Sequence, residues 1–195
     1  MTRIAFILSV LLVSFGVLAA PAQAQCVNGT ITSEIQVGGP YDGLYKYTIA
    51  ITWSTNKGLS HVTLDCNFGM CPAEACAADW YFDDPAGSGT VGIPVECEFD
   101  MVGEFNCDGD ASIGLTDPVL KWDAIADTTG CEPDREGTAT MCFYTSVAPV
   151  QHETPVVLVK NGQNVCQGTI VGACPLPCAT PVQHSTWGRI KHLFN

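Results

Sequence analysis

Oxygen-bearing side chains recur at every second residue across one short segment, which is how calcium loops space their ligands. The residues concerned are Glu104, Asn106, Asp108 and Asp110. Gly109 supplies the sharp turn that an EF-hand-like loop needs, but position twelve of that loop is Leu115, where a carboxylate is required. The segment therefore predicts an Asp-Gly turn, with calcium at these four residues as the alternative. No other cofactor is predicted.

Histidine, the commonest general base, is the next candidate for chemistry. A Ser-His-acid arrangement in the body of the chain could use only His61 or His152, and the sequence has neither a G-x-S-x-G nor an H-E-x-x-H motif. Because His61 alternates with Val62 on an expected strand, we predict a structural histidine. We expect a protein without enzymatic activity, and a secreted hydrolase ranks third among the functions considered.

Three adjacent aromatic residues, Trp80, Tyr81 and Phe82, could form a stacking platform for sugar rings. Successive side chains of a strand point to opposite faces, so some of the three are expected in the core and one outside. The segment predicts an ordinary half-buried strand, with a carbohydrate-binding surface as the alternative.

The first 24 residues have the features of a secretory signal peptide. Arg3 provides the positive charge, an uncharged apolar run extends from Ile4 to Ala20, and Ala22-Gln23-Ala24 offers a small-x-small cleavage site. We therefore expect three parts: a signal peptide over residues 1–24, one domain over 25–178, and a linker with a tail over 179–195. No later run is long and apolar enough to predict a membrane span.

All eleven cysteines follow the expected cleavage site. They are Cys26, Cys66, Cys71, Cys76, Cys97, Cys107, Cys131, Cys142, Cys166, Cys174 and Cys178. After an export signal this density predicts disulfides, and the odd count leaves at least one thiol free, intermolecular or only partly bridged. Zinc at Cys66, Cys71, Cys76 and His61 is a weaker interpretation, because only three cysteines cluster and an oxidising compartment opposes free thiolates. Cys174 and Cys178 are expected to form a staple at the end of the domain.

The formal net charge of −12 excludes some partners. An acidic surface repels the phosphates of nucleic acids and of anionic lipids, so neither is an expected partner. A location outside the cell or on its outer surface is expected. The expected partners are a cell-surface or matrix component, or a glycan.

Short runs of alternating and β-branched residues, separated by Gly, Pro and Asp, extend through the body. The expected strands cover residues 31–37, 45–53, 59–66, 80–82, 90–99, 119–122, 138–147, 156–160 and 165–171. Asn161-Gly162 predicts a hairpin between the last two. Roughly eight such strands indicate a sandwich or a barrel, and we predict a disulfide-stabilised antiparallel β-sandwich, Ig-like or jelly-roll-like. The segment from Cys66 to Cys76 is expected to be a stapled loop.

The last eleven residues form a short amphipathic tail after a proline-rich linker. Its pattern, T-W-G-R-I-K-H-L-F, is centred on Trp187, Gly188, Arg189, Ile190 and Lys191. It resembles a C-terminal signature, T-W-G-x-I-K-x-L-aromatic, of exported proteins from environmental bacteria. The body, with YKYTIAITW, GLSHVTL and CFYTS, is similar to uncharacterised secreted bacterial β-sandwich proteins. The resemblance implies a bacterial extracellular protein whose tail is a sorting or attachment signal, and it carries no activity.

These observations predict a secreted or cell-surface protein with a structural or adhesive role and without enzymatic activity. The alternative is an extracellular carbohydrate- or calcium-binding module.

Overall fold

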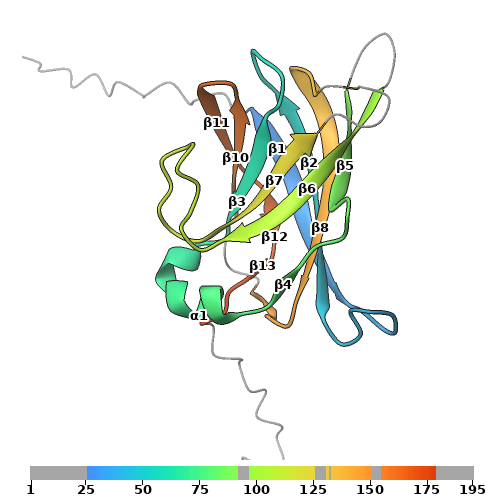
Figure 1. Cartoon of the computed structure of the whole chain (residues 1–195), viewed down its shortest axis with the longest axis vertical. Coiled ribbons are helices and arrows are strands. Elements are labelled where there is room, and N and C mark those ends of the chain that lie inside the picture. The colour runs from blue at the N-terminus through green and yellow to red at the C-terminus, as the bar shows by residue number, and fades with distance from the viewer. Residues whose placement is uncertain (1–25, 92–96, 126–130, 132, 151–154, 179–195) are drawn as a thin grey trace, which may run out of the picture.

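The structure, a computed structural model, describes residues 26–91, 97–125, 131, 133–150 and 155–178. The expected signal peptide and the expected tail lie outside the described residues. Almost all of the remaining chain belongs to one β-rich body (Figure 1).

Strands dominate the described residues. The strands are β1 (Val27–Ile35), β2 (Tyr45–Ser54), β3 (His61–Asp65), β4 (Trp80–Tyr81), β5 (Gly87–Val91), β6 (Cys97–Asn106), β7 (Val119–Ile125), β8 (Glu136–Thr145), β9 (Pro149–Val150), β10 (Val156–Asn161), β11 (Asn164–Thr169), β12 (Val171–Gly172) and β13 (Cys174–Pro175). The helices are a 3-10 turn, η1 (Phe68–Met70), and α1 (Pro72–Ala77). Within the described residues no helix has the length and apolarity of a membrane span.

One hydrogen-bonded sheet joins eleven of these strands. Their order is β11-β10-β3-β7-β6-β5-β8-β2-β1-β12, with β4 added to β8, while β13 and β9 form a separate pair. Since β12 follows β11 after the single residue Ile170, the two ends of this order are neighbours in the chain, and the sheet curls until it nearly closes (Figure 1). The mainly β, disulfide-linked fold is confirmed. The expected division into two sheets is not clearly present, because the ladder of strand pairs is unbroken from β11 to β12 and forms one continuous, barrel-like sheet.

Alternation along the strands builds the core. In β2, Tyr47, Ile49, Ile51 and Trp53 are buried, as the sequence predicts, while the intervening residues point outward. The partner strand β8 contributes Phe143, whose ring stacks on Tyr47 with centroids 4.8 Å apart. Burying each such large side chain contributes on the order of 1.5–3 kcal/mol to the hydrophobic stabilisation.

Two expectations about local structure have different outcomes. The hairpin predicted at Asn161-Gly162 is confirmed, since β10 and β11 pair from Val156↔Thr169 to Asn161↔Asn164. The single strand predicted over residues 90–99 is wrong. That segment contains the end of β5 and the start of β6, which pair antiparallel with Val91 opposite Cys97. Gly92 and Pro94 lie between them, and both residue types disfavour a strand interior.

The segment from Cys66 to Cys76 covers one end of the barrel. It contains η1 and α1 rather than irregular loop alone, and Pro72 occupies a first-turn position of α1, where its missing N–H costs nothing. Phe68 is fully buried and packs edge-to-face against Trp80 and Phe105. The segment therefore acts as a hydrophobic plug.

Five disulfides involve ten of the eleven cysteines. Three hold the plug, through Cys66–Cys174, Cys71–Cys178 and Cys76–Cys107. The expected staple between Cys174 and Cys178 is thus corrected, because each of them reaches back to the plug instead. The other two bridges are Cys97–Cys131 and Cys26–Cys166, and Cys142 is free.

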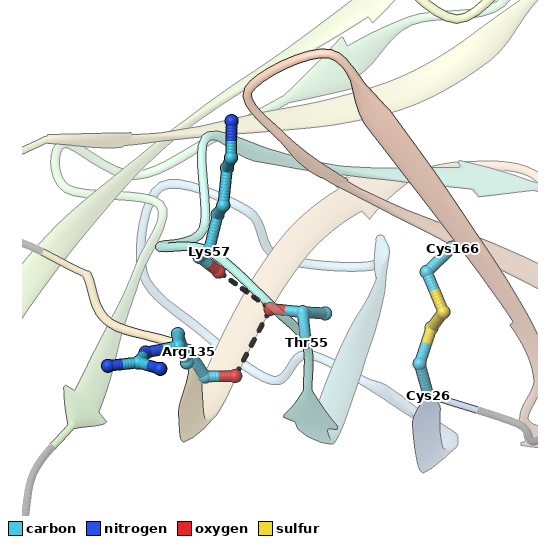
Figure 2. Close-up of a disulfide and its surroundings, with 5 residues drawn as sticks. All are labelled: Cys26, Thr55, Lys57, Arg135 and Cys166. Atoms are coloured by element: carbon cyan, nitrogen blue, oxygen red, sulfur yellow. Dashed lines mark hydrogen bonds between the residues drawn. A yellow bond between two sulfur atoms is a disulfide. The ribbon is translucent and has the colours of Figure 1, made fainter.

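The bridge Cys26–Cys166 lies at the seam where the sheet closes. It joins the residue before β1 to β11, two strands that contact each other without forming a ladder of their own (Figure 2). At the same seam, β12 pairs in parallel with β1, and a Cβ added to Gly172 would lie 1.9 Å from the carbonyl oxygen of Ile31. Glycine is therefore required at position 172 for this close approach.

The hydroxyl of Thr55, near the seam, connects two neighbouring loops by hydrogen bonds. Thr55 Oγ1 lies 2.7 Å from the carbonyl oxygen of Lys57 and 3.1 Å from that of Arg135 (Figure 2). Its single proton can be donated to either oxygen. The connection that follows β2 is thereby fastened to the segment that enters β8.

We expect the seam bridge to contribute measurably to stability. The double variant Cys26→Ser/Cys166→Ser should lower the free energy of unfolding by about 2–5 kcal/mol, because the unfolded chain loses one of its five cross-links and gains conformational entropy. Denaturant unfolding followed by tryptophan fluorescence measures this change. The matched control Cys142→Ser removes a thiol without removing a bridge, and equal stability of the two variants would contradict the prediction.

Candidate functional site

A histidine, an aspartate and a serine meet at one side of the barrel. His61 begins β3, and Asp110 and Ser112 belong to the connection from β6 to β7. His61 Nε2 lies 3.0 Å from Asp110 Oδ2 and 3.3 Å from Ser112 Oγ, while Ser112 Oγ donates to Asp110 Oδ1 at 2.5 Å. Thr63 also donates to Asp110, at 2.9 Å. His61 and Asp110 are both buried.

Burial and hydrogen bonding set the charges of this cluster. Burial lowers the pKa of His61, although the neighbouring Asp110 carboxylate opposes this effect. Burial alone would raise the pKa of Asp110, but hydrogen bonds from Ser112 and Thr63, together with His61, lower it overall. At neutral pH the cluster therefore contains a carboxylate and a neutral imidazole, and the 3.0 Å approach of Nε2 to Asp110 Oδ2 favours the tautomer with its proton on Nε2.

This arrangement differs from a nucleophilic triad. In a triad one imidazole nitrogen accepts the serine proton and the other donates to the acid. Here serine and acid lie at the same nitrogen, and the hydroxyl of Ser112 donates to the carboxylate. The other nitrogen, Nδ1, faces Asp123 Oδ1 at 3.9 Å, which is beyond a hydrogen bond. The cluster fastens the connection between β6 and β7 to β3, which supports the structural interpretation of His61.

The four residues proposed for calcium lie at the end of β6 and in the turn that follows. Asn106 Oδ1 accepts the backbone N–H of Asp108 at 3.0 Å, and Gly109 has a φ of 78°, so the predicted Asp-Gly turn is present. Glu104 on β6 approaches Lys121 at 3.7 Å, and Asp110 is engaged as described above. Among the described residues no group of three or more His, Cys, Asp or Glu side chains is arranged to hold a metal ion. Calcium binding stays a prediction.

The predicted aromatic triplet is divided between two faces. Trp80 stacks on Phe105 with centroids 4.4 Å apart and donates its Nε1–H to the carbonyl of Ala75. Phe82 packs against the core, with its ring 6.1 Å from that of Trp122. Only Tyr81 of the three has an exposed side chain, 42% accessible. The division follows the alternation of a strand.

Tyr81 lies beside two other tyrosines, and we call the three residues the tyrosine group. Its members are Tyr41, Tyr81 and Tyr144. The Tyr41 ring stacks on Tyr144 with centroids 3.9 Å apart and lies 5.9 Å from Tyr81. Tyr144 donates its hydroxyl to Asp83 at 2.7 Å, and Lys46 Nζ lies 5.8 Å from the centre of the Tyr144 ring. Burial, followed by Asp83, raises the pKa values of Tyr41 and Tyr144, so both phenols are neutral.

The middle of the outward face of β1, β2, β8 and β5 carries short polar side chains, which we call the hydroxyl strip, and the charged residues Glu34, Lys46 and Glu136 lie beyond it on the same face. Its members are Asn28, Thr30, Thr32, Thr48, Ala50, Thr52, Thr138, Thr140, Ser88 and Thr90. The strand register aligns them in rows across the strands. One row joins residues 28, 52, 138 and 90, and the next joins residues 30, 50, 140 and 88. Within the first row Thr90 and Thr138 share a hydrogen bond of 2.9 Å.

An open cleft of about 630 Å³ lies at one end of the hydroxyl strip. Three residues of the hydroxyl strip also line this cleft, namely Thr52, Thr90 and Thr138. The cleft adds Asn56 and a run of charged residues, Asp134, Arg135 and Glu136. A shallower groove covers the middle of the strip, with Thr52 and Thr138 common to the two depressions.

The free cysteine borders the other end of the strip. Cys142 Sγ lies 3.7 Å from Asp83 Oδ2, and burial, followed by this carboxylate, raises the pKa of the thiol. A raised pKa keeps the sulfur protonated and weakly nucleophilic at neutral pH. Cys142 therefore adds no reactive group to this face.

Sequence reasoning pointed to His61, Tyr81 and Asp110 but missed the neighbours that complete each cluster. Ser112, Tyr41 and the rows of the strip are brought together by strand pairing between distant segments. The one available signal was the repeated T-x-T spacing, as in Thr30-Ile31-Thr32 and Thr138-Ala139-Thr140. Comparison of the chain with protein-family models, curated proteins and solved structures gave no match.

The buried imidazole predicts a loss of stability in mild acid. As the pH falls through about 6.5, the unfolded chain gains a proton on His61 that the folded chain, with its lower pKa, does not, so the free energy of unfolding decreases with a limiting slope of about 1.4 kcal/mol per pH unit. His61→Gln should remove this contribution between pH 7.5 and 5. Among the groups that act on His61, Asp110 has a lowered pKa and Lys121 a raised pKa, so both keep their charges in that range.

Denaturant unfolding at several pH values measures the slope. The control Ser112→Ala removes a hydrogen bond to Asp110 yet keeps the imidazole, so it should lower stability without changing the slope. An identical slope in the parent protein and His61→Gln would contradict the assignment of a neutral His61.

Proposed function

We propose that this protein is exported from a bacterial cell through its signal peptide and acts at the cell exterior as a non-enzymatic structural or adhesive domain. The observation that carries the proposal is the pattern of five disulfides, which join the seam, the plug and the far end of the sheet. Such bridges persist in an oxidising compartment and are rare in a reducing cytosol. The acidic net charge of −12 suits a soluble extracellular surface.

The hydrogen-bond arrangement of the His61 cluster supports a non-enzymatic role. A serine nucleophile needs a base to accept its proton, whereas Ser112 donates that proton to Asp110. The imidazole is buried and uses Nε2 for the same carboxylate. These groups hold a loop in place instead of activating a hydroxyl.

The C-terminal tail is proposed to retain the protein at the cell surface. Deleting residues 185–195 should move the protein from the cell-associated fraction to the medium, while the disulfide-linked body remains folded. Fractionation of the producing cells, followed by immunoblotting, measures the distribution. A matched variant, Trp187→Ala, tests the aromatic position of the signature alone. Unchanged cell association of the deletion variant would contradict a sorting role.

The non-enzymatic part of the proposal has a separate test. The purified protein is expected to turn over neither short-chain esters nor glycosides. Turnover that is abolished by Ser112→Ala or His61→Ala would instead revive the hydrolase alternative.

A further inference from the structure

The hydroxyl strip is uncharged in a protein whose net charge is strongly acidic. The chain has 20 acidic and 8 basic residues, yet all ten positions of the strip carry a hydroxyl, an amide or a methyl group. Outward strand positions usually accept charged side chains, which also protect a sheet from association. Neutral groups in aligned rows suit a ligand that is itself neutral and rich in hydrogen-bonding groups.

The chemistry of the strip discriminates between classes of macromolecule. A nucleic acid requires cations along its path, and the strip offers none. The core of a protein interface is enriched in aromatic residues, Met and Arg, whereas this strip consists of Thr, Ser, Asn and Ala. Hydroxyl groups both donate and accept hydrogen bonds, as the hydroxyls of a sugar do.

The two ends of the strip differ in a way that fits a sugar polymer. On β8 the outward positions continue from the strip to Tyr144, where the tyrosine group offers the exposed ring of Tyr81 beside Tyr41. In the opposite direction they lead to Glu136 in the polar cleft. These ends are eight residues apart, about 27 Å at the rise of a strand, which is long enough for several sugar rings.

The curvature of the sheet favours a flexible ligand over a flat one. Neighbouring strands are rotated by roughly 20–25° relative to one another, so a rigid crystalline surface would contact only part of the four-strand face. A single polysaccharide chain can follow β2 and β8 along their length, with its rings stacking at the aromatic end.

We propose that the hydroxyl strip, together with Tyr41 and Tyr81, binds an uncharged polysaccharide along β2 and β8. This inference rests on the proposed adhesive function and gives its partner a chemical class. The hydroxyls of the strip bind the sugar hydroxyls, and the tyrosine group stacks on a ring at one end.

Affinity electrophoresis of the full chain in gels containing a soluble β-glucan, a mannan or an α-glucan tests the proposal, with a polyuronate as the charged comparison. Retarded migration is expected with at least one neutral polysaccharide. Tyr81→Ala should weaken the binding on the order of ten-fold, and Thr52→Val/Thr138→Val by about three- to ten-fold, through the lost stacking and the lost hydroxyls. Valine keeps the shape and strand propensity of threonine, so the fold is preserved.

The control is Thr116→Val, in the connection between β6 and β7, which lies away from the strip (Figure 1). It should bind as the parent protein does. Absence of retardation by every neutral polysaccharide, retardation by the polyuronate alone, or equal binding by all variants would overturn the inference. A protein that still adheres to isolated cell-surface material after the strip variants would keep the adhesive function while losing this ligand.

Discussion

Closure of the sheet at the seam between β1 and β11 is the constraint on which the rest of the molecule depends. The two strands come from opposite ends of the domain, and their contact is completed by the parallel pairing of β12 with β1 and by the bridge Cys26–Cys166. Without this closure, the inward residues of β1, Val27 and Ile31, would border water instead of a core. Gly172 is part of the same constraint, because only a residue without Cβ fits against Ile31.

The remaining disulfides also hold segments that are distant in the sequence against the ends of the barrel. The plug presents a short helix and one fully buried aromatic side chain, Phe68, and a helix of six residues is unstable on its own. Three disulfides hold it to the end of β6 and to the C-terminal part of the domain. Covalent links therefore stabilise the part of the core that regular secondary structure stabilises least.

The sequence was most informative where structure depends on neighbouring residues. The alternation in β2 predicted which face is buried, and Asn161-Gly162 predicted a hairpin. The nearly closed sheet could not be predicted in this way, because strand order is set by pairing between segments as distant as Thr30 and Val171. Disulfide pairing was equally hidden, since it depends on which loops the topology brings together.

In the candidate sites, too, single residues could be predicted from their own segments, whereas their partners from distant segments could not. Tyr81 could be singled out from its own segment, but its partner Tyr41 comes from the connection between β1 and β2. Likewise, His61 was visible in the sequence, whereas its contact with Ser112 arises only after β3 and β7 pair.

The alternation that builds the core also determines the outward face. Every inward Ile, Trp or Met on β2 and β8 places its neighbours outside, so the composition of the exterior is free to vary without loss of packing. On most outward surfaces of soluble proteins this freedom is used for charge, which keeps them dispersed. Here the middle of the outward face of four adjacent strands carries Thr, Ser, Asn and Ala instead, in rows aligned by the register of the pairs, and the charged residues Glu34, Lys46 and Glu136 lie towards its ends. Stability does not require that choice, since charged side chains would be tolerated at the same positions. The uncharged rows are therefore better explained by what this face contacts than by how the barrel folds.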